Sequence, residues 1–405
     1  MSGRRPTQAV ILAGGQGTRL RPLTETRPKP MIEFHGKPFL EYLIELLRDQ
    51  GFERVLLLLG YLPEVIQTHF GDRSRWGLDI EYAISSVDDE TGRRLKLAAS
   101  RLEPTFLFLY CDNYWPMSFD RMWKRYLTTG AQAMLTVYQN SDHYTRDNVR
   151  VDSAGWIVAY DKDRKAPDLH GVDIGFGLFT REIVERLPSD NVSFERVIYP
   201  QLVASRQLQA FPTDHRYYSV SSHERLAITE QFLARRPTVI LDRDGVLNRK
   251  PPRAEYVRSW AQWQWLPGAK EALRAFTEAG YRIIMVSNQA GIARGAMREA
   301  DLRAIHERLR ADVREAGGEI EAMYYCPHGW DDGCACRKPK PGMLFAAQRE
   351  FHLDLSRTYV IGDDERDGQA AEAAGCPWML VSETRPLLEI TQELLRHDVA
   401  ALQRC

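Results

Sequence analysis

The sequence has little of what marks a membrane protein, a nucleic-acid-binding protein or a disulfide-stabilised secreted protein. The best apolar run covers residues 55–59, far short of the roughly 20 residues that a spanning helix needs. Lys and Arg number 54 and Asp and Glu 55, so a net charge of −1 provides no basic surface for nucleic acid or an anionic membrane. Six cysteines in 405 residues do not make a disulfide scaffold. We expect a cytoplasmic protein with neither nucleic acid nor membrane as a partner.

The beginning of the sequence only superficially resembles a secretory signal. Arg4 and Arg5 precede an apolar stretch at 9–13, but this stretch is too short. Gly14 and Gly15 follow where a cleavage site would stand. We interpret residues 9–13 as the first strand of a folded domain.

Short apolar strands alternate with amphipathic helices along the whole chain, which predicts α/β layers around largely parallel sheets. One predicted helix spans 39–50 and stops at Gly51. Pro237 cannot continue the helix before it, and a new strand starts at once. We therefore predict two Rossmann-like three-layer domains, at 1–236 and 237–405. The predicted strands include residues 55–59, 106–110, 238–241, 281–286 and 358–361.

A glycine-rich turn follows the first predicted strand. Its residues Gly14, Gly15, Gly17 and Thr18 would let backbone N–H groups approach a phosphate, and Arg19 can pair with phosphoryl oxygens. The turn is neither a Walker A loop nor the Gly-x-Gly-x-x-Gly fingerprint of dinucleotide-binding folds. By itself it predicts little beyond a turn.

Together with 21–24 (Arg-Pro-Leu-Thr) and 28–31 (Pro-Lys-Pro-Met), the turn resembles the signature of sugar-1-phosphate nucleotidylyltransferases, over roughly residues 8–230. The resemblance implies a nucleotide-diphospho-sugar transferase fold. It implies that Arg19 holds the triphosphate, that Lys29 neutralises the α-phosphate region and that Asp112 binds Mg²⁺. In this reaction a sugar 1-phosphate oxygen attacks the α-phosphorus of a nucleoside triphosphate, and pyrophosphate leaves.

Two positions depart from that family. Where the family has a Gly-Thr-Gly-Gly-type loop, this chain has Glu-Thr-Gly-Arg-Arg at 90–94. Where the family has a second metal aspartate, the corresponding residue is Ser219, a far poorer Mg²⁺ ligand. Asp173 could compensate near the sugar or be an ordinary loop carboxylate. These departures leave open which base is used and whether this domain is active.

The C-terminal half has four motifs in order, each directly after or at the end of a predicted strand. They lie at residues 239–248, 287–289, 336–343 and 362–367. They resemble the motifs of haloacid dehalogenase (HAD)-type phosphatases. By the resemblance, Asp242 is the nucleophile and Asp244 the general acid and base. Ser287, Asn288, Arg337 and Lys338 bind phosphoryl oxygens. Asp242, Asp363 and the main-chain carbonyl of Asp244 hold Mg²⁺, and Asp367 assists the metal or orients its neighbours.

Cys326, His328, Cys334 and Cys336 lie within residues 326–336. One imidazole and three thiolates are the ligand set of a closed structural Zn²⁺ site. The alternative, ordinary reduced cysteines, does not explain their spacing. We predict a zinc-binding loop that positions Arg337 and Lys338 over the active site.

Residues 238–382 closely resemble D-glycero-D-manno-heptose 1,7-bisphosphate phosphatases, relatives of histidinol phosphatase that share the zinc loop. Asp364 is a departure, since many of these phosphatases have lysine there. Such a phosphatase makes the sugar 1-phosphate that a nucleotidylyltransferase consumes, so we predict a bifunctional enzyme that uses GTP by analogy with guanylyltransferases of the pathway. Three alternatives stay open: another nucleotide, a different sugar or histidinol phosphate, and a degenerate N-terminal domain that only binds a nucleotide sugar. The oligomeric state is also open.

Overall fold

The computed structural model describes residues 4–71, 75–252 and 254–402. The chain divides into two compact units between Leu233 and Ala234, where the sequence analysis placed the division after Arg236. Helix α7 (His223–Leu233) ends at this point, before Pro237 and the first strand of the second unit. No helix of the described part is long and apolar enough to span a membrane.

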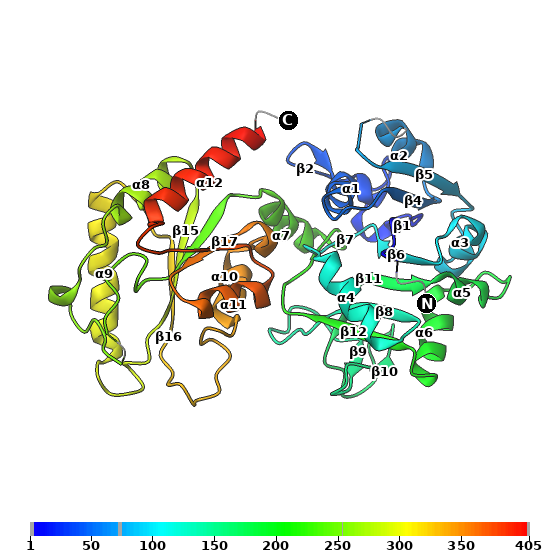
Figure 1. The fold of residues 1–405 in the computed structure, drawn as a ribbon. Helices are drawn as coiled ribbons and strands as arrows, with labels where there is room; N and C mark the ends of the chain where they lie inside the picture. The colour runs from blue at the N-terminus through cyan, green and yellow to red at the C-terminus, as the bar shows by residue number, and fades with distance from the viewer. Residues whose placement is uncertain (1–3, 72–74, 253, 403–405) are drawn as a thin grey trace. The chain divides into compact units, whose positions relative to one another are not determined.

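The first unit is built on a seven-stranded sheet (Figure 1). Only β11 runs against its neighbours β6 and β8, and the other pairings are parallel. In spatial order the strands are β12 (Leu208–Thr213), β8 (Ala133–Tyr138), β11 (Val172–Thr180), β6 (Thr105–Tyr110), β1 (Gln8–Ala13), β4 (Arg54–Leu59) and β5 (Asp79–Ile84).

Helices cover both faces of this sheet because the strand residues alternate between two hydrophobic cores. Ala9, Ile11 and Ala13 of β1 lie in one core, and Val10 and Leu12 lie in the other. The first core takes residues from α1 (Phe39–Asp49), α2 (Pro63–Phe70), α4 (Phe119–Thr129) and α7. The second takes residues from α3 (Thr91–Leu97), α5 (Arg181–Glu185) and α6 (Phe194–Ala204).

Three small pairs of strands complete the first unit. One of them, β13 with β7, lies beside the end of β6. The pairs are β2 (Glu33–Phe34) with β3 (Lys37–Pro38), β7 (Asn113–Tyr114) with β13 (Tyr218–Ser219), and β9 (Val149–Val151) with β10 (Ile157–Tyr160).

The second unit is built on a five-stranded, wholly parallel sheet. Its order is β16 (Ala322–Cys326), β15 (Arg282–Asn288), β14 (Thr238–Leu241), β17 (Tyr359–Gly362) and β18 (Trp378–Leu380). Two cores again lie on its faces. One includes α8 (Ala269–Glu278), α9 (Glu299–Glu315) and α12 (Leu387–Leu402), and the other includes α10 (Gly342–Phe351) and α11 (Glu365–Ala374).

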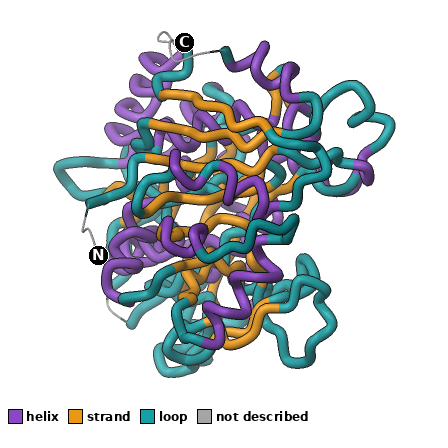
Figure 2. The backbone as a smooth tube through the Cα atoms, turned by 90° about the vertical axis from the view of Figure 1, so that its right-hand side faces the viewer, coloured by secondary structure: helices purple, strands orange, loops and turns teal. Residues whose placement is uncertain are grey.

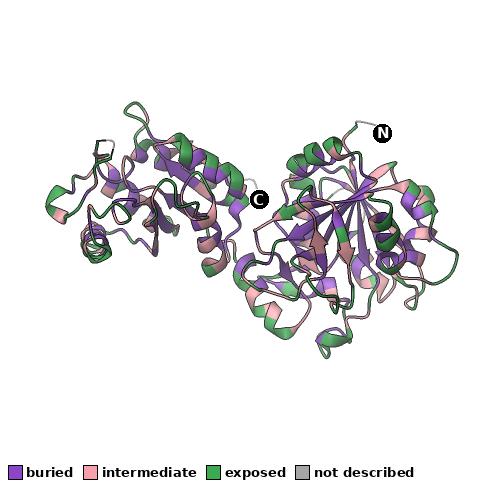
Figure 3. Cartoon of the chain, turned by 90° about the horizontal axis from the view of Figure 1, so that it is seen from below, coloured by how far each residue is buried: buried purple, intermediate pink, exposed green. Residues whose placement is uncertain are grey.

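The predicted fold class, two three-layer α/β units, is therefore confirmed. Strands lie between helices in Figure 2, and they are predominantly buried in Figure 3, where exposed residues gather on the helices and loops. The predicted strand 281–286 in fact spans Arg282–Asn288, so Ser287 and Asn288 belong to the strand. Residues 91–94, which stand where the related family has a glycine-rich loop, form the first turn of helix α3.

Candidate active sites

In the second unit, the predicted phosphatase residues meet at one edge of the sheet. Strand β14 is central, with β15 on one side and β17 on the other. Asp242 follows β14, Ser287 and Asn288 end β15, and Asp363 follows β17. Because the carboxyl ends of parallel strands share one edge, the fold brings these residues together, as it does in other open α/β sheets.

Lys338 reaches this edge from the segment after the zinc loop. Its ammonium lies 2.9 Å from Asp242 Oδ1 and 2.5 Å from Asp367 Oδ1, and it also donates to the carbonyl of Val286. Asn288 fixes the lysine's backbone, since its side chain accepts from Lys338 N and donates to Lys338 O. Asn288 thus holds Lys338 in place.

The charged groups of this cluster shift one another's pKa values. Burial raises the pKa of Asp242 to about 7, with Lys338 lowering it and Asp367 raising it. Burial alone would lower the pKa of Lys338, but Asp242 and Asp367 raise it above its usual value. A single buried cation therefore serves two carboxylates, and further positive charge would favour the ionised form of Asp242.

Asp244 is held from three sides. Arg243 donates to it through Nη2 at 2.9 and 3.0 Å, Asn248 through Nδ2 at 2.9 Å, and Gln289 through Nε2 at 3.1 Å. Burial raises its pKa, but these contacts, Arg243 above all, bring it below its usual value. Gln289 also donates to Ser287 Oγ at 2.7 Å.

Sequence reasoning missed the supporting part played by Arg243. This side chain is 1% exposed and lies over the Trp263 ring. Its position inside the Asp-Arg-Asp motif was visible in the sequence. Its burial could not be predicted from the sequence, because an arginine in a loop is usually exposed to solvent.

The carboxylates of Asp242, Asp363 and Asp367 could hold a metal ion, since one oxygen from each lies within 4.8 Å of the others. Asp363 Oδ1 is buried without a hydrogen-bond partner among the described residues, as expected of a metal ligand. Gly245 and Gly362 allow the close approach, because a Cβ at either would collide with a carboxylate of the cluster. Oxygen ligands of this kind fit Mg²⁺. Asp244 is not in this group, as its carboxylate faces Arg243.

A pocket of about 910 Å³ opens over these residues. It is lined by the cluster and by two loops. The loop after β14 contributes Lys250, Pro251, Pro252, Ala254, Glu255 and Tyr256, and the predicted zinc loop contributes Gly329, Trp330, Gly333 and Cys334. The lining contains more cations than the reacting group needs: Lys250, Arg337, Lys338, Lys340 and Arg366.

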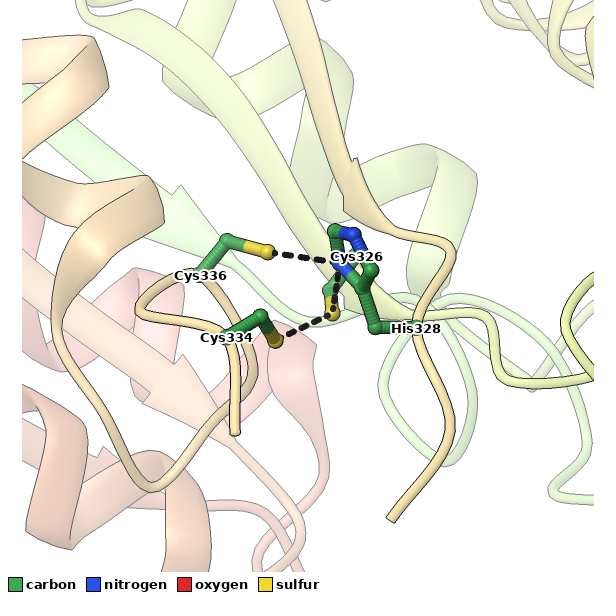
Figure 4. Close-up of side chains that lie close together, drawn as sticks. All are labelled: Cys326, His328, Cys334 and Cys336. Atoms are coloured by element: carbon green, nitrogen blue, oxygen red, sulfur yellow. Dashed lines mark hydrogen bonds between the residues drawn. The ribbon is translucent and has the colours of Figure 1, made fainter. Parts of the chain in front are cut away.

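The four predicted zinc ligands point toward one another (Figure 4). Cys326 Sγ lies 3.6 Å from Cys334 Sγ and 3.6 Å from His328 Nδ1, and His328 Nδ1 lies 3.2 Å from Cys336 Sγ. Tetrahedral zinc separates such ligand atoms by about 3.5–3.8 Å, close to the observed 3.2–3.6 Å, whereas a disulfide requires about 2.05 Å. The cysteines are free, and the four side chains fit Zn²⁺.

In the first unit, the glycine-rich turn follows β1 at the corresponding edge of the sheet. Gly17 has φ of 64°, and Thr24 Oγ1 donates to its carbonyl at 2.9 Å. Gly14 is buried, while Gly15, Thr18 and Arg19 are exposed at the turn. The turn therefore presents Arg19 and backbone groups to solvent, where a triphosphate can reach them.

Lys29 and Asp112 come together although 83 residues separate them. Lys29 Nζ lies 2.5 Å from Asp112 Oδ2. The backbone of Asp112 accepts from Val220 N, and Ser219 pairs with Asn113 through β13 and β7. The structure thus places Ser219 beside Asp112, where the resemblance put the second metal ligand. Ser219 Oγ lies 2.8 Å from Ser221 Oγ.

Arg94 occupies the space beside the turn. Its guanidinium is buried and donates to the carbonyls of Leu59, Gly14 and Val87 and to Ser85 Oγ. Burial lowers its pKa. A Cβ on Gly14 would collide with this guanidinium. Arg94 therefore joins the ends of β1 and β4 where the related family has glycines, while Arg93 donates to the carbonyl of Ser189.

Asp173 lies at the same edge because β11 runs antiparallel to its neighbours. Burial raises its pKa to about 7, although Gly175 N donates to it at 2.9 Å. Beyond it is Glu195, which accepts from Tyr110, Ser193 and Lys162. Burial raises the pKa of Glu195, but Lys162 and these hydrogen bonds lower it below its usual value. Sequence reasoning assigned nothing to Lys162 or Glu195.

The two units match different protein families. Residues 8–158 match the nucleotidyl transferase family, and residues 335–387 match the HAD-hydrolase-like family. The chain is thus a HAD phosphatase fused to a nucleotidyltransferase.

For the second unit, the D-glycero-beta-D-manno-heptose-1,7-bisphosphate 7-phosphatase of Pseudomonas putida is 44% identical over 171 residues. This match covers 41% of this chain and 97% of that protein.

For the first unit, a solved structure from Bacillus anthracis, described as a candidate glucose-1-phosphate thymidylyltransferase, shares the fold at 16% identity. Its TM-score is 0.50, and the match covers 55% of this chain and 93% of that chain. The structure of HddC from Yersinia pseudotuberculosis complexed with GMP-PN is 25% identical, with a TM-score of 0.47, over 56% of this chain and 99% of that chain.

Proposed function

Because the chain belongs, through its second unit, to the D-glycero-beta-D-manno-heptose-1,7-bisphosphate 7-phosphatase family, we propose that it performs two consecutive steps of heptose activation. The second unit removes the 7-phosphate of heptose 1,7-bisphosphate. The first unit joins the resulting heptose 1-phosphate to a nucleotide, with GTP as the donor. Its partners are small-molecule substrates, and its compartment is the cytoplasm, where nucleoside triphosphates are available.

The observation that carries the phosphatase assignment is the arrangement around Asp242. A carboxylate at the end of a central strand is paired with a buried ammonium, and a second aspartate is fixed two residues on. This is the geometry of a nucleophile beside an acid–base group. It lies at the base of the cation-lined pocket.

In the first half-reaction, a carboxylate oxygen of Asp242 attacks phosphorus and the bond to the C7 oxygen breaks. Asp244 gives its proton to the leaving oxygen. Arg243 holds the pKa of Asp244 low in the free protein, so the carboxyl must take up its proton as the dianionic phosphate enters and raises that pKa. In the second half, Asp244 accepts a proton from water, and the water oxygen displaces Asp242 from phosphorus.

The remaining residues bind and orient the phosphate. Lys338 neutralises the phosphoryl oxygens, Ser287 donates to them, and Arg337 lines the same pocket. Mg²⁺, held by Asp242 and Asp363 with the carbonyl of Asp244, would supply positive charge for the phosphoryl group. Asp367 orients Lys338, and Asn288 fixes its backbone. Zn²⁺ on Cys326, His328, Cys334 and Cys336 would hold the loop that delivers Arg337 and Lys338.

In the first unit, the turn of Gly14, Gly15, Gly17 and Thr18 cradles the triphosphate. Arg19 pairs with its oxygens. Lys29 leaves Asp112 to neutralise the α-phosphate. The freed carboxylate of Asp112 would hold Mg²⁺, which would supply further positive charge for the triphosphate. An oxygen of the sugar 1-phosphate then attacks the α-phosphorus, and pyrophosphate leaves. Asp173 lies on the sugar side of this edge.

A second candidate function for this unit is suggested by Arg94 and Ser219. The guanidinium fills space beside Gly14, and the second metal position lacks a carboxylate. A unit so altered could bind a nucleotide sugar without making one.

The test uses two variants of the full chain, Asp242→Asn and Asp112→Asn. We expect Asp242→Asn to lose phosphate release and to keep pyrophosphate release from heptose 1-phosphate and GTP. Asp112→Asn should show the reverse. Each variant is the folding control for the other. Repeating the pyrophosphate assay with ATP, CTP and UTP identifies the base. Wild-type protein that releases no pyrophosphate with any nucleotide would support the binding function instead.

A further inference from the structure

Two cations of the pocket flank Asp364, the residue that departs from the related phosphatases. Arg366 pairs with its carboxylate through Nε at 2.8 Å and Nη2 at 2.9 Å. Lys250, from the loop after β14, lies 3.3 Å from Asp364 Oδ2 and 2.7 Å from Asp363 Oδ2. We call Lys250, Asp364 and Arg366 the Asp364 cluster.

Asp364 cannot act as a free negative charge in the pocket. Two hydrogen bonds from Arg366 and the nearby ammonium of Lys250 pair with this carboxylate. Its side chain also caps helix α11 by accepting from Arg366 N at 3.1 Å, which fixes its position. With two cations and one carboxylate, the Asp364 cluster carries a net charge of about +1.

Within the cluster, Lys250 has the spare bonding capacity. Arg366 directs its fork to Asp364. An ammonium has three donors, and the contacts of Lys250 with Asp363 and Asp364 use two of them. The side chain is 46% exposed and lines the pocket, so its four-carbon stem can follow a ligand.

We propose that Lys250 binds the second, non-reacting phosphate of the substrate and so selects a bisphosphate over a monophosphate. The inference rests on the proposed function, because it requires a substrate with two phosphates. Asp242, Ser287 and Lys338 take the phosphate that reacts. The other phosphate stays within the same pocket, and the Asp364 cluster gives it a positive surface beside Asp363.

The test compares Lys250→Met, which removes the charge and keeps the length, with Lys250→Arg, which keeps the charge. The substrates are heptose 1,7-bisphosphate and heptose 7-phosphate. Losing a charged hydrogen bond in Lys250→Met should raise KM for the bisphosphate about tenfold, with kcat little changed. KM for the monophosphate should stay within about twofold, and Lys250→Arg should restore most of the preference.

Lys340→Met is the matched control variant, because Lys340 is the alternative binding residue for the second phosphate. Lys340 lines the same pocket but donates to the carbonyl of Gly333 in the zinc loop. If Lys340→Met loses the preference for the bisphosphate and Lys250→Met keeps it, the second phosphate binds at the zinc loop and the proposal is wrong. An equal loss for both substrates in Lys250→Met would also overturn it.

The substrate itself is tested separately. If wild-type protein leaves heptose 1,7-bisphosphate intact, the proposed function is refuted, and the comparison is made with fructose 1,6-bisphosphate and fructose 6-phosphate. A preference for that bisphosphate that disappears in Lys250→Met supports Lys250 as the second phosphate site. The same rates with and without Lys250 overturn it.

Discussion

The buried ammonium of Lys338 lies 2.9 Å from the carboxylate of Asp242, which follows the end of β14. The same ammonium lies 2.5 Å from Asp367, so it holds together two carboxylates that would otherwise repel each other. This contact couples stability to function, because the residue that prepares the nucleophile also makes its burial possible.

Lys338→Met should therefore damage both. Asp242 and Asp367 would lose the cation that pairs with both of them, at a cost of about 3–5 kcal/mol in the free energy of unfolding of the second unit. Phosphate release should fall at least about 100-fold. Pyrophosphate release by the first unit serves as the internal control. A variant with wild-type phosphatase activity would contradict the assigned position of Lys338.

The zinc loop gives a prediction in metal content. Purified protein should contain one zinc per chain, and Cys326→Ser with Cys334→Ser should contain none, because two of four ligands are gone. We expect this double variant to lose phosphatase activity that added Mg²⁺ does not restore. Elemental analysis beside the phosphate assay measures both. Full activity in a zinc-free protein would show that the loop needs no metal.

Ser219→Asp tests the second metal position of the first unit. The residue lies beside Asp112 through the pairing of β13 with β7, so a carboxylate there should join Asp112 as a ligand. We predict that half-maximal pyrophosphate release moves to a severalfold lower Mg²⁺ concentration. Ser222→Asp is the matched control, since Ser222 lies beyond the strand and beyond Ser221, whose hydroxyl contacts that of Ser219. An unchanged Mg²⁺ dependence would mean that residue 219 does not reach the metal.

Asp173 gives the pH prediction. Its pKa is about 7 in the folded protein, because burial favours the neutral form, and about 3.9 in an unfolded chain. The folded state thus binds more protons between these values, and stability falls as pH rises from about 4 to about 7. Asp173→Asn removes this loss while its side-chain oxygen can still accept from Gly175 N.

We expect Asp173→Asn to be more stable than wild type by about 4 kcal/mol at pH 8, with the difference shrinking toward pH 4. Thermal unfolding at a series of pH values, followed by the loss of pyrophosphate release or by tryptophan fluorescence, measures it. A difference that does not depend on pH would show that Asp173 is already ionised in the folded protein.

The convergence of the predicted phosphatase residues at one sheet edge could be predicted from the sequence, because strand ends determine it. Asp242, Ser287 and Asp363 each stand where an apolar run stops, and parallel pairing brings such ends together. The clustering of Cys326, His328, Cys334 and Cys336 was equally predictable, since these residues are close in sequence. The division into two units was predictable near Pro237, because a proline that ends a helix is a local signal. The structure divides the chain after Leu233.

Contacts between distant residues could not be predicted in this way. The pairing of Lys29 with Asp112, the burial of Arg94 beside Gly14 and the Asp364 cluster all depend on how long side chains fold across the sheet edge. From sequence alone, arginine and lysine are expected to be exposed to solvent, and only the folded structure shows which of them are buried.

The most direct test of two linked activities is a single assay in which both reactions are followed in the same mixture. Full-length protein with Mg²⁺ receives heptose 1,7-bisphosphate and GTP, and inorganic phosphate, pyrophosphate and nucleotide sugar are followed together. Two active units predict phosphate first, then pyrophosphate and GDP-heptose in equal amounts. Phosphate release with no pyrophosphate, even when heptose 1-phosphate is added directly, would contradict the account of the first unit.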